Sequence, residues 1–591
     1  MNEDNTLLII YALLGVVLTI LLIGMARAIR RHRDLTSAGA KLTAEIEGRA
    51  VGMCILLPNL NECIAAGDWT LFYSLEEATK KVTTADIQRV ANEYLNVDQS
   101  TTGWFVPIQA GAGAPKAPGA AAKLFNEAIG DGPYYYRTPG VAYGPLPATK
   151  SSSENPGAAT STGRPAPTHI AAKAVRSKIA GIDLIAYPTG VKNVVTLRGG
   201  FPAGTVFAGR GNAAVPKLTG MLLDEGTTRQ DKFAIATKLE SVGATISFSV
   251  GAQMVEIDAK CLKEDVPLVV SLIAEQLRFP ALAAEELEKM KKQYAGSLQR
   301  QLEDTNFRAG DAFSRAVFPV GHPNRDPAPD ELLAAIEAAK LDDIVAFHKK
   351  HYGPAHLTLV ATGDLDLATL QREVEKSFAG WSGGVALPQP PKATSTNSPK
   401  SVDLAMPGKT SASVVLGQAS GLRYRDPDYQ AVRLATAILG SGFTGRLMAN
   451  VRDKEGLTYG IGSYLFGDTF TDGAWQISAS FAPALLDKGI TSTKRQLMSW
   501  YEEGVTTEEV ERAKSRLIGS FEVGLATSSG MANNLLATVN RGYDLGWLDR
   551  FAPTLAAITT DQVNHAVKKH LRPDELYLVR AGTFGGVEAK K

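Results

Sequence analysis

The chain contains one pattern three times, and this internal repeat constrains its fold more than any other feature. In each copy a polar helical segment leads through a turn into an apolar strand, at residues 82–105, 341–364 and 559–581. A second series of segments precedes the last two copies in the same order, at residues 222–298 and 438–521. Recurrence of this kind indicates similar structural units in tandem. We therefore expect two complete repeats, preceded by the closing part of an earlier one.

Hydrophobic periodicity indicates the secondary structure within each repeat. Apolar and polar residues alternate at residues 195–201 and 474–481, which predicts strands. Residues 265–278 and 431–439 have the spacing of apolar residues that is typical of helices. Strands and helices in this order predict an α+β fold, in which helices pack on one side of an antiparallel or mixed sheet.

Composition and the repeats together divide the chain into six segments. The third is rich in Ala, Gly, Pro and Ser and carries too little apolar surface to offset the entropy of ordering, which predicts a flexible linker. The predicted segments are a transmembrane anchor with a basic flank (1–34), the C-terminal remnant of a preceding domain (35–107), this linker (108–167), the first complete repeat (168–385), a second linker (386–400) and the second complete repeat (401–585).

The N-terminal segment has the composition of a membrane span. Leu7–Met25 contains no charged residue and is about 19 residues long, enough to cross roughly 28 Å of hydrocarbon as a helix. Glu3 and Asp4 precede it, whereas a cleaved signal peptide would begin with basic residues. Arg27 and Arg30 follow it, and a basic flank favours a cytoplasmic position for the body of the protein. We therefore expect a single-pass, membrane-anchored protein.

Charge and cysteine content exclude several classes of function. The chain has 62 Lys and Arg against 61 Asp and Glu, a formal net charge of +1, so no overall field would attract nucleic acid. We expect no nucleic-acid partner. Its three cysteines, Cys54, Cys63 and Cys261, lack the paired spacing of a disulfide framework or a thiolate zinc site.

Several motifs resemble one family of peptidases. Residues 439–447 (LGSGFTGRL) and 451–463 (VRDKEGLTYGIGS) look like the final domain of the pitrilysin and insulinase relatives, the inverzincin zinc metallopeptidases. Residues 216–228 with 239–244 resemble the preceding domain, and residues 67–107 resemble the tail of the zinc-bearing half. Members of this family have two halves that close around a chamber. The resemblance implies that this chain holds the second, non-zinc half whole, and it suggests a bacterial periplasmic location.

The zinc motif of that family is missing from the positions where it would fall. Zinc is bound there by H-x-x-E-H on a helix and by a Glu further on. The corresponding helix reads Lys217-Leu-Thr-Gly-Met221, and the later helix has Gly296 and Ser297 near the position of the Glu. These side chains supply neither two imidazoles nor a general base. We therefore expect no metal or other cofactor in this chain, zinc only on a partner half, and no activity of the chain alone.

Three histidines could suggest a substitute metal site, because His348, His351 and His356 are closely spaced. The internal repeat argues against it. His351 aligns with Tyr94 and His570 in the other two copies, so this position takes a ring in all three. We interpret the ring as structural.

Gly440–Gly445 fits the pattern G-x-G-x-x-G of dinucleotide-binding proteins. In those proteins the glycines follow a strand and open a helix. Here the preceding residues, 431–439, are predicted to be a helix, so we interpret the glycines as a helix-ending turn.

Arg452 and Tyr459 are the candidate substrate-binding residues. At the equivalent positions of the first repeat the chain has Leu239 and Ile246, which are ordinary core residues. Burying a guanidinium and a phenol without partners is costly, which favours a water-filled or substrate-filled surrounding. The resemblance implies that both side chains reach across the chamber towards the scissile peptide. The alternative is a structural pair that closes the turn at Gly456.

The leading hypothesis is a non-catalytic half of a peptidase chamber, which binds extended peptides as added strands and needs a zinc-bearing peptidase subunit of the same family. Proteolysis would then depend on both chains. Two alternatives stay open. The chain could be a non-enzymatic peptide-binding or assembly subunit, or a truncated fragment of a full-length zinc protease.

Overall fold

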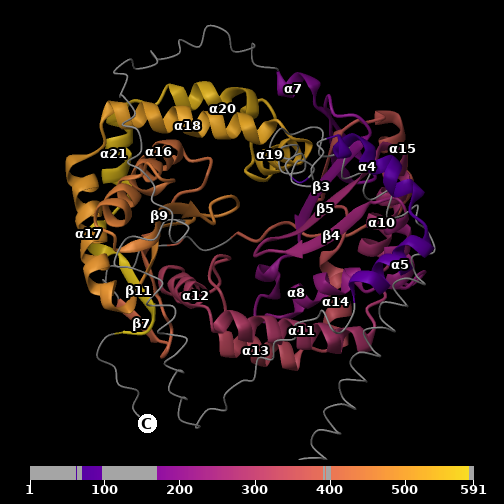
Figure 1. The fold of residues 1–591 in the computed structure, drawn as a ribbon, viewed down its shortest axis with the longest axis horizontal. Helices are drawn as coiled ribbons and strands as arrows, with labels where there is room; N and C mark the ends of the chain where they lie inside the picture. The colour runs from indigo at the N-terminus through magenta and orange to yellow at the C-terminus, as the bar shows by residue number, and fades with distance from the viewer. Residues whose placement is uncertain (1–61, 63–69, 96–168, 390–392, 394–400, 585–591) are drawn as a thin grey trace, which may run out of the picture. The chain divides into compact units, whose positions relative to one another are not determined.

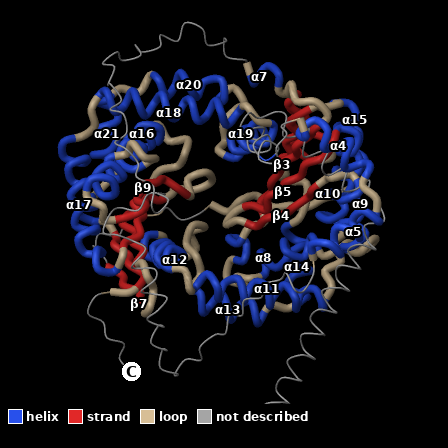
Figure 2. The backbone as a smooth tube through the Cα atoms, viewed as in Figure 1, coloured by secondary structure: helices blue, strands red, loops and turns tan. Residues whose placement is uncertain are grey.

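The computed structural model describes residues 62, 70–95, 169–389, 393 and 401–584. The chain divides into two parts, residues 1–81 with 169–591 and residues 82–168. Helix α4 (Leu71–Lys81) belongs to the first part and α5 (Thr84–Tyr94) to the second. All other helices and strands described below belong to the first part and form two similar α+β repeats (Figures 1 and 2).

The first repeat contains a six-stranded mixed sheet in the order β1-β2-β6-β3-β5-β4. β2 and β6 are parallel, and the other neighbouring strands are antiparallel. Its strands are β1 (Val175–Ile179), β2 (Ile182–Pro188), β3 (Val194–Pro202), β4 (Thr245–Val250), β5 (Met254–Leu262) and β6 (Thr358–Gly363). Its helices are α7 (Ile170–Lys173), α8 (Val215–Met221), α9 (Lys232–Ser241), α10 (Val266–Arg278), α11 (Ala284–Leu302), α12 (Thr305–Val317), α13 (Pro329–Ala338), α14 (Leu341–His351) and α15 (Leu367–Phe378), with short 3-10 turns at Thr205–Ala208, Leu222–Asp224 and Lys263–Asp265.

The second repeat contains a five-stranded mixed sheet in the order β7-β11-β8-β10-β9. β7 and β11 are parallel, and the other neighbours are antiparallel. Its strands are β7 (Ser401–Ala405), β8 (Ala412–Ala419), β9 (Thr458–Phe466), β10 (Ala474–Phe481) and β11 (Tyr577–Gly582). Its helices are α16 (Tyr429–Gly440), the π-helical segment η5 (Met448–Lys454), α17 (Leu486–Glu503), α18 (Thr507–Leu525), α19 (Ser528–Asn540), α20 (Trp547–Ala556) and α21 (Thr560–His570), with 3-10 turns at Pro483–Leu485 and Pro573–Glu575.

One face of each sheet packs against helices of its own repeat. In the first repeat, Leu197 of β3 and Val255 of β5 lie in one core with side chains of α8, α10, α14 and α15. In the second, Ile477 of β10 lies in one core with Val432 of α16 and Val563 of α21. The alternation of apolar residues along β10 follows from this one-sided packing, because successive side chains of a strand point to opposite faces.

The other face of each sheet is covered by a helix from the other repeat. Helix α12 of the first repeat packs on β8 and β11, where Phe313 contacts the apolar cluster around Val415. Helix α19 of the second repeat packs on β3 and β6, where Leu535 lies in a cluster with Val360. The central strands are therefore buried on both faces, which explains why β6 and β8 are buried along their whole length.

The structure confirms the predicted α+β fold with mixed sheets. The prediction of a transmembrane helix and a single-pass membrane anchor, in contrast, is not supported and is corrected. Within the described ranges, no helix combines the length and the apolar character that crossing a bilayer requires. The longest helices there, α11 and α18, have 19 residues each and carry charged side chains along their length, as expected of helices with one solvated face. Leu7–Met25, on which the prediction rested, lies outside the described residues.

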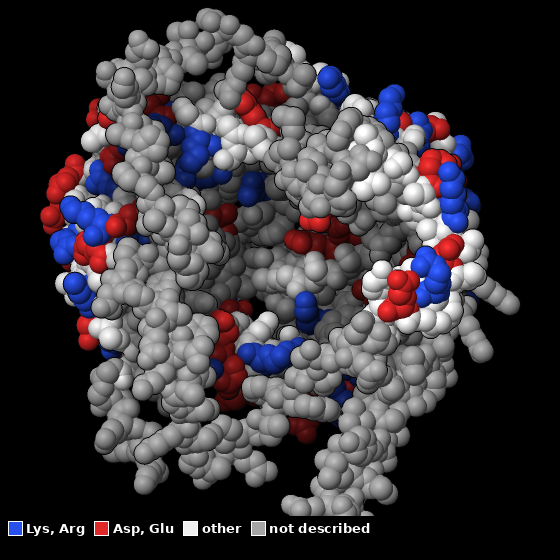
Figure 3. All heavy atoms as spheres, in the orientation of Figure 1, with Lys and Arg blue, Asp and Glu red and all other residues white. Residues whose placement is uncertain are grey.

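Charged side chains of both signs share the surface. On the face drawn in Figure 3, the Lys and Arg side chains of the described residues are interspersed with Asp and Glu. Among the described residues, several charged side chains are paired, such as Arg446 with Glu509 at 2.7 Å and Arg512 with Glu508 at 2.7 Å. The described part of this face therefore concentrates neither sign, in contrast to the basic stripe of a nucleic-acid-binding surface.

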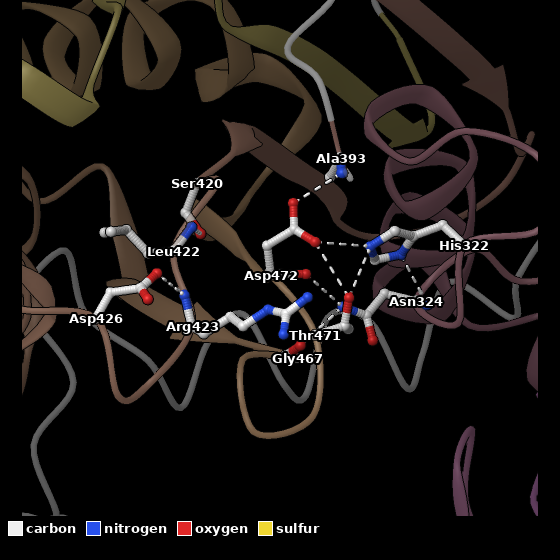
Figure 4. Close-up of polar contacts among 10 residues, drawn as sticks. All are labelled: His322, Asn324, Ala393, Ser420, Leu422, Arg423, Asp426, Gly467, Thr471 and Asp472. Atoms are coloured by element: carbon white, nitrogen blue, oxygen red, sulfur yellow. Dashed lines mark hydrogen bonds and ion pairs between the residues drawn. The ribbon is translucent and has the colours of Figure 1, made fainter. Parts of the chain in front are cut away.

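A buried polar cluster joins the loop after α12 to the loop between β9 and β10 (Figure 4). Nδ1 of His322 accepts a hydrogen bond from the backbone N–H of Asn324 at 3.1 Å, so Nε2 carries the ring proton. Nε2 lies 3.4 Å from Oδ1 of Asp472 and 3.3 Å from Oγ1 of Thr471. The other oxygen of Asp472 accepts from the backbone N–H of Ala393 at 2.7 Å. Asp472 thus ties the second repeat both to the first and to Ala393.

This cluster predicts an acid-sensitive contact. Burial raises the pKa of the Asp472 carboxyl, but hydrogen bonds from His322, Ala393 and Thr471 outweigh burial and hold the pKa below its ordinary value. A carboxyl whose pKa is lowered on folding stabilises the folded state above its unfolded pKa, about 3.9, and loses this contribution as the pH falls further. In urea titrations, Asp472→Asn should therefore be less stable than wild type at pH 7, with a difference that narrows below about pH 4.

Asp574→Asn, at an exposed position, is the matched control and should follow the wild-type curve at every pH. A difference between wild type and Asp472→Asn that stays constant from pH 7 to pH 3 would contradict the assigned role of the charged carboxylate.

Candidate functional site

The candidate site is built on β9, the edge strand of the second sheet, where the end of α16 approaches it closely. Gly440 is the last residue of α16, and a Cβ at this position would lie 2.5 Å from the backbone nitrogen of Ser463 on β9. The hydroxyl of Ser463 donates to the carbonyl of Thr436 in α16 at 2.8 Å. Glycine is therefore required at the contact, and the helix end and the edge strand are held in fixed register.

A β-bulge at the start of β9 sets the direction of Tyr459. Ser480 of β10 pairs with Gly460, but the next residue, Phe481, pairs with Thr458, so Tyr459 is the extra residue of the bulge. The hydroxyl of Thr458 donates to the carbonyl of Ser480 at 2.5 Å and accepts from the N–H of Gly460 at 3.2 Å, which stabilises the bulge. A bulge re-aims a side chain out of the regular alternation. The Tyr459 side chain is accordingly 89% exposed.

Arg452 lies on η5 and reaches the same place. Gly456, with a φ of 64°, ends this segment, and its N–H donates to the carbonyl of Arg452 at 2.9 Å. The Arg452 side chain is only 13% exposed, and its Nε lies 3.8 Å from a carboxylate oxygen of Asp453. Its Cζ lies 5.2 Å from the ring centre of Tyr459 and 5.1 Å from that of Phe443. The structure therefore brings the two predicted residues together, with the guanidinium between two aromatic rings at cation-π distance.

A cavity of about 340 Å³ lies between the glycine-rich turn after α16, η5 and the edge of the sheet. Phe443, which is 71% exposed, borders this cavity on the side of the turn. The lining residues are Asn306, Gly440, Gly442, Phe443, Met448, Gly460, Ile461, Gly462, Tyr464, Ser478, Ala479 and Ser480. Gly442 in the turn and Gly460 on the strand are exposed, so their backbone is open to any molecule that enters.

The first repeat has no such arrangement at the equivalent place. Ile246 pairs with Ala259 in an unbroken β4–β5 register, so its side chain points into the core instead of outward. Leu239 lies on α9, where it packs against the same core. The physical difference between the repeats is thus the bulge, which releases one residue of the strand from the core in the second repeat alone.

In the first repeat, α8 stands in the position of the helix that would carry the zinc motif. Its residues lack the side chains that bind zinc. Its sequence VPKLTGM offers one amine, a hydroxyl and a thioether. The Thr219 hydroxyl donates to its own helix at Val215 O, and Gly220 is packed so tightly that a Cβ would overlap Val250. In the described ranges no group of three His, Cys, Asp or Glu side chains could hold a metal ion. No catalytic step through zinc can therefore be assigned to these residues.

The three neighbouring histidines have separate surroundings. Nε2 of His348 donates to the carbonyl of Leu277 at 2.8 Å, and burial lowers the pKa of this ring. His351 packs against Phe347, with ring centres 4.4 Å apart, and burial lowers its pKa as well. His356 lines a different cavity. His348 therefore has a hydrogen-bonding role and His351 a packing role.

Two further motifs have structural roles in the described chain. The glycines of Gly440–Gly445 follow the helix α16, not a strand, and Gly442 adopts a φ of 73° in the turn. The Thr471, His322 and Asp472 cluster does not have the geometry of a nucleophile relay, because Thr471 and Asp472 both lie at Nε2 of the ring. In a catalytic triad the nucleophile and the acid occupy opposite nitrogens.

Sequence reasoning missed Phe443 and Thr458, which complete the site. Phe443 could have been found, because a large aromatic residue inside a glycine-rich turn has no core to enter and is exposed there. Thr458 could not, because its role depends on the register between β9 and β10.

The chain is similar to several known proteins. Residues 338–517 match the peptidase M16 inactive domain. An uncharacterized zinc protease of Streptomyces coelicolor is 26% identical over 357 residues, which are 58% of this chain and 75% of that protein. The non-peptidase homolog YmxG of Helicobacter pylori is 23% identical over 397 residues, 66% of this chain and 88% of that protein. The crystal structure of a peptidase M16 inactive domain from Pseudomonas fluorescens superposes with a TM-score of 0.64 at 25% identity, over 71% of this chain and 99% of that one.

The fold of the two repeats is therefore similar to that of a peptidase M16 inactive domain. The chain is similar to the pitrilysin and insulinase superfamily of M16 peptidases, and its match to the inactive domain fits the second, non-zinc half of those proteins.

Proposed function

We propose that this chain is the substrate-binding, non-catalytic half of a two-chain zinc peptidase, in which a separate chain of the same family holds the zinc. Extended peptides are its substrates. The observation that carries the proposal is the position of Arg452 and Tyr459, which lie together at the outer edge of β9.

The outer edge of β9 is suited to an extended peptide. β9 is the last strand of its sheet and pairs with β10 alone in the described part of the chain. An unpaired edge offers backbone N–H and C=O groups to an added strand. Gly460, which is exposed, carries no side chain that would hinder its approach.

Arg452 and Tyr459 supply the polar groups that a bound peptide needs. A guanidinium can donate two parallel hydrogen bonds to a carbonyl or carboxylate oxygen, and the rings of Phe443 and Tyr459 hold it in one orientation. The phenol of Tyr459 points away from the core and can donate to an oxygen that gains negative charge during cleavage. Both groups act on the substrate, so the zinc and the general base must come from the partner chain.

The names of the relatives support both parts of the proposal. Several similar proteins are named zinc proteases, whereas the Helicobacter pylori protein is named a non-peptidase homolog. A family in which active and inactive chains both occur is consistent with a division of labour between two polypeptides.

The test is a reconstitution with quenched fluorescent peptides. The full chain alone should cleave none of them, and a family peptidase that carries H-x-x-E-H should show weak activity alone. Mixing the two should raise the rate by at least about tenfold, and a chelator should abolish it, because donors preorganised for the transition state contribute factors of this size or larger.

Two results would contradict the proposal. Chelator-sensitive cleavage by the chain alone would place a metal site in it. A stable complex with no gain in rate would instead indicate the alternative function, a subunit that binds or assembles without a part in catalysis.

A further inference from the structure

Helix α5 exposes an apolar stripe. Ile87, Val90 and Tyr94 recur at the spacing of one helix face, and their exposed fractions are 39%, 43% and 65%. None of the described residues of α5 is buried. On the polar face, in contrast, side chains pair with one another within the helix. The charged groups of Arg89 and Glu93, for example, lie 3.2 Å apart. The apolar face of α5 therefore has the pattern of a surface that packs against another element.

The internal repeat identifies what packs on such a helix. α5, α14 and α21 occupy the same position in the three copies of the pattern, and we refer to them as the closing helices. Their first turns are identical in design, because the N-cap N–H donates to the side chain three residues later in each one. These bonds run from Thr83 to Asp86 at 3.0 Å, from Lys340 to Asp343 at 3.3 Å and from Thr559 to Gln562 at 2.8 Å.

The residues equivalent to the stripe are buried in both complete repeats. Ile344 and Phe347 of α14 correspond to Ile87 and Val90, and they lie in the core where α14 packs on α8. Val563 of α21 takes the same position as Ile344, is fully buried, and lies in the core where α21 packs on α16. The natural cover of a closing helix is thus the helix that stands in the place of α8 or α16.

We propose that the apolar stripe of α5 docks on a second polypeptide, namely on the helix equivalent to α8 and α16 in a peptidase-family domain that lacks a closing helix of its own. The complex would complete that domain with a helix from this chain. The proposal rests on the proposed function for the class of the partner, but not on Arg452 or Tyr459.

Within this chain, both helix faces that could receive α5 are already covered by another closing helix. The α8 face is occupied by α14, and the α16 face by α21. A second copy of the chain has the same two faces occupied in the same way. Among the residues that the structure describes, this chain therefore offers no unoccupied face of this kind, which favours a domain of a different polypeptide.

The test measures binding to two probes with the full chain. Both probes derive from a family peptidase chain that carries H-x-x-E-H, one intact and one without its closing helix and the strand that follows. The full chain should bind the shortened probe at least about 30-fold more tightly than the intact one, and Ile87→Asp with Val90→Asp should remove this difference, because two apolar side chains lose their burial. Gln88→Asp with Asn92→Asp, on the polar face, is the matched control and should bind within about twofold of wild type.

Where the shortened probe does not fold alone, co-expression replaces the binding measurement. Wild type should then yield soluble probe, and the Ile87→Asp, Val90→Asp variant should not. Arg452→Ala should behave as wild type in both formats, which separates this inference from the proposed function. The proposal would be overturned if the chain bound both probes equally, or if the Ile87→Asp, Val90→Asp variant bound the shortened probe as tightly as wild type does. It would also be overturned if the chain neither bound nor rescued the shortened probe, or if it associated with itself in a way that depends on Ile87.

Discussion

Replacing Arg452 with alanine should lower the partner-dependent rate of peptide cleavage by about 10²- to 10³-fold, the usual cost of losing a preorganised donor to a developing charge. The complex with the partner should still form. The expected loss follows from the geometry of the side chain, which is 13% exposed and lies at cation-π distance from two rings. The measurement is kcat/KM for a quenched fluorescent peptide, with complex formation followed by light scattering.

Three variants show whether the effect comes from the guanidinium itself. Arg452→Lys keeps the charge but not the planar fork, so it should recover only part of the rate. Tyr459→Phe keeps the cation-π contact and removes the hydroxyl, and should cost less than Arg452→Ala. Arg512→Ala removes an exposed arginine paired with Glu508 and should leave the rate unchanged. A wild-type rate in Arg452→Ala with an intact complex would assign Arg452 to the structural closure of the turn at Gly456.

The repeated pattern predicted much of the fold because apolar spacing records which face of an element is buried. The strands at 195–201 and 474–481 and the helices at 265–278 and 431–439 are found as β3, β10, α10 and α16. The pattern could not show what each face packs against. α12 and α19 are amphipathic helices by sequence, but each covers the sheet of the other repeat, a pairing that only tertiary structure determines.

The candidate site was predictable in its residues but not in its shape. The contrast of Arg452 and Tyr459 with Leu239 and Ile246 was visible in the sequence, and the structure places the two side chains near each other beside the second sheet, while their role in binding substrate stays a prediction. The bulge that exposes Tyr459 was not visible, because both edge strands have the composition of ordinary strands and the bulge arises from pairing with β10. The membrane anchor was inferred from hydropathy and flanking charge, and no described helix supports it.

The second large effect should come from Trp475, whose replacement by alanine should lower the free energy of unfolding of the second repeat by about 3–5 kcal/mol. Trp475 is fully buried and stacks on Trp500, with ring centres 6.2 Å apart. Its Nε1 donates to the hydroxyl of Thr436 in α16 at 3.1 Å, so the substitution removes both a large apolar volume and a bond between sheet and helix. Urea unfolding, followed by hydrogen exchange of individual segments, measures the change.

The segments that lose protection against hydrogen exchange are as informative as the size of the change in stability. β9 is joined to the sheet through β10 alone in the described chain, so loosening β10 should release the edge strand that carries Tyr459. Exchange should therefore speed up in β8, β9 and β10, while β2 and β6 of the first repeat, covered by α19, keep most of their protection. Trp475→Phe, which retains most of the volume, should cost roughly half as much. Uniform loss of protection across both repeats would show that they unfold as one unit, and a change below about 1 kcal/mol would contradict the role given to the Trp475 and Thr436 contact.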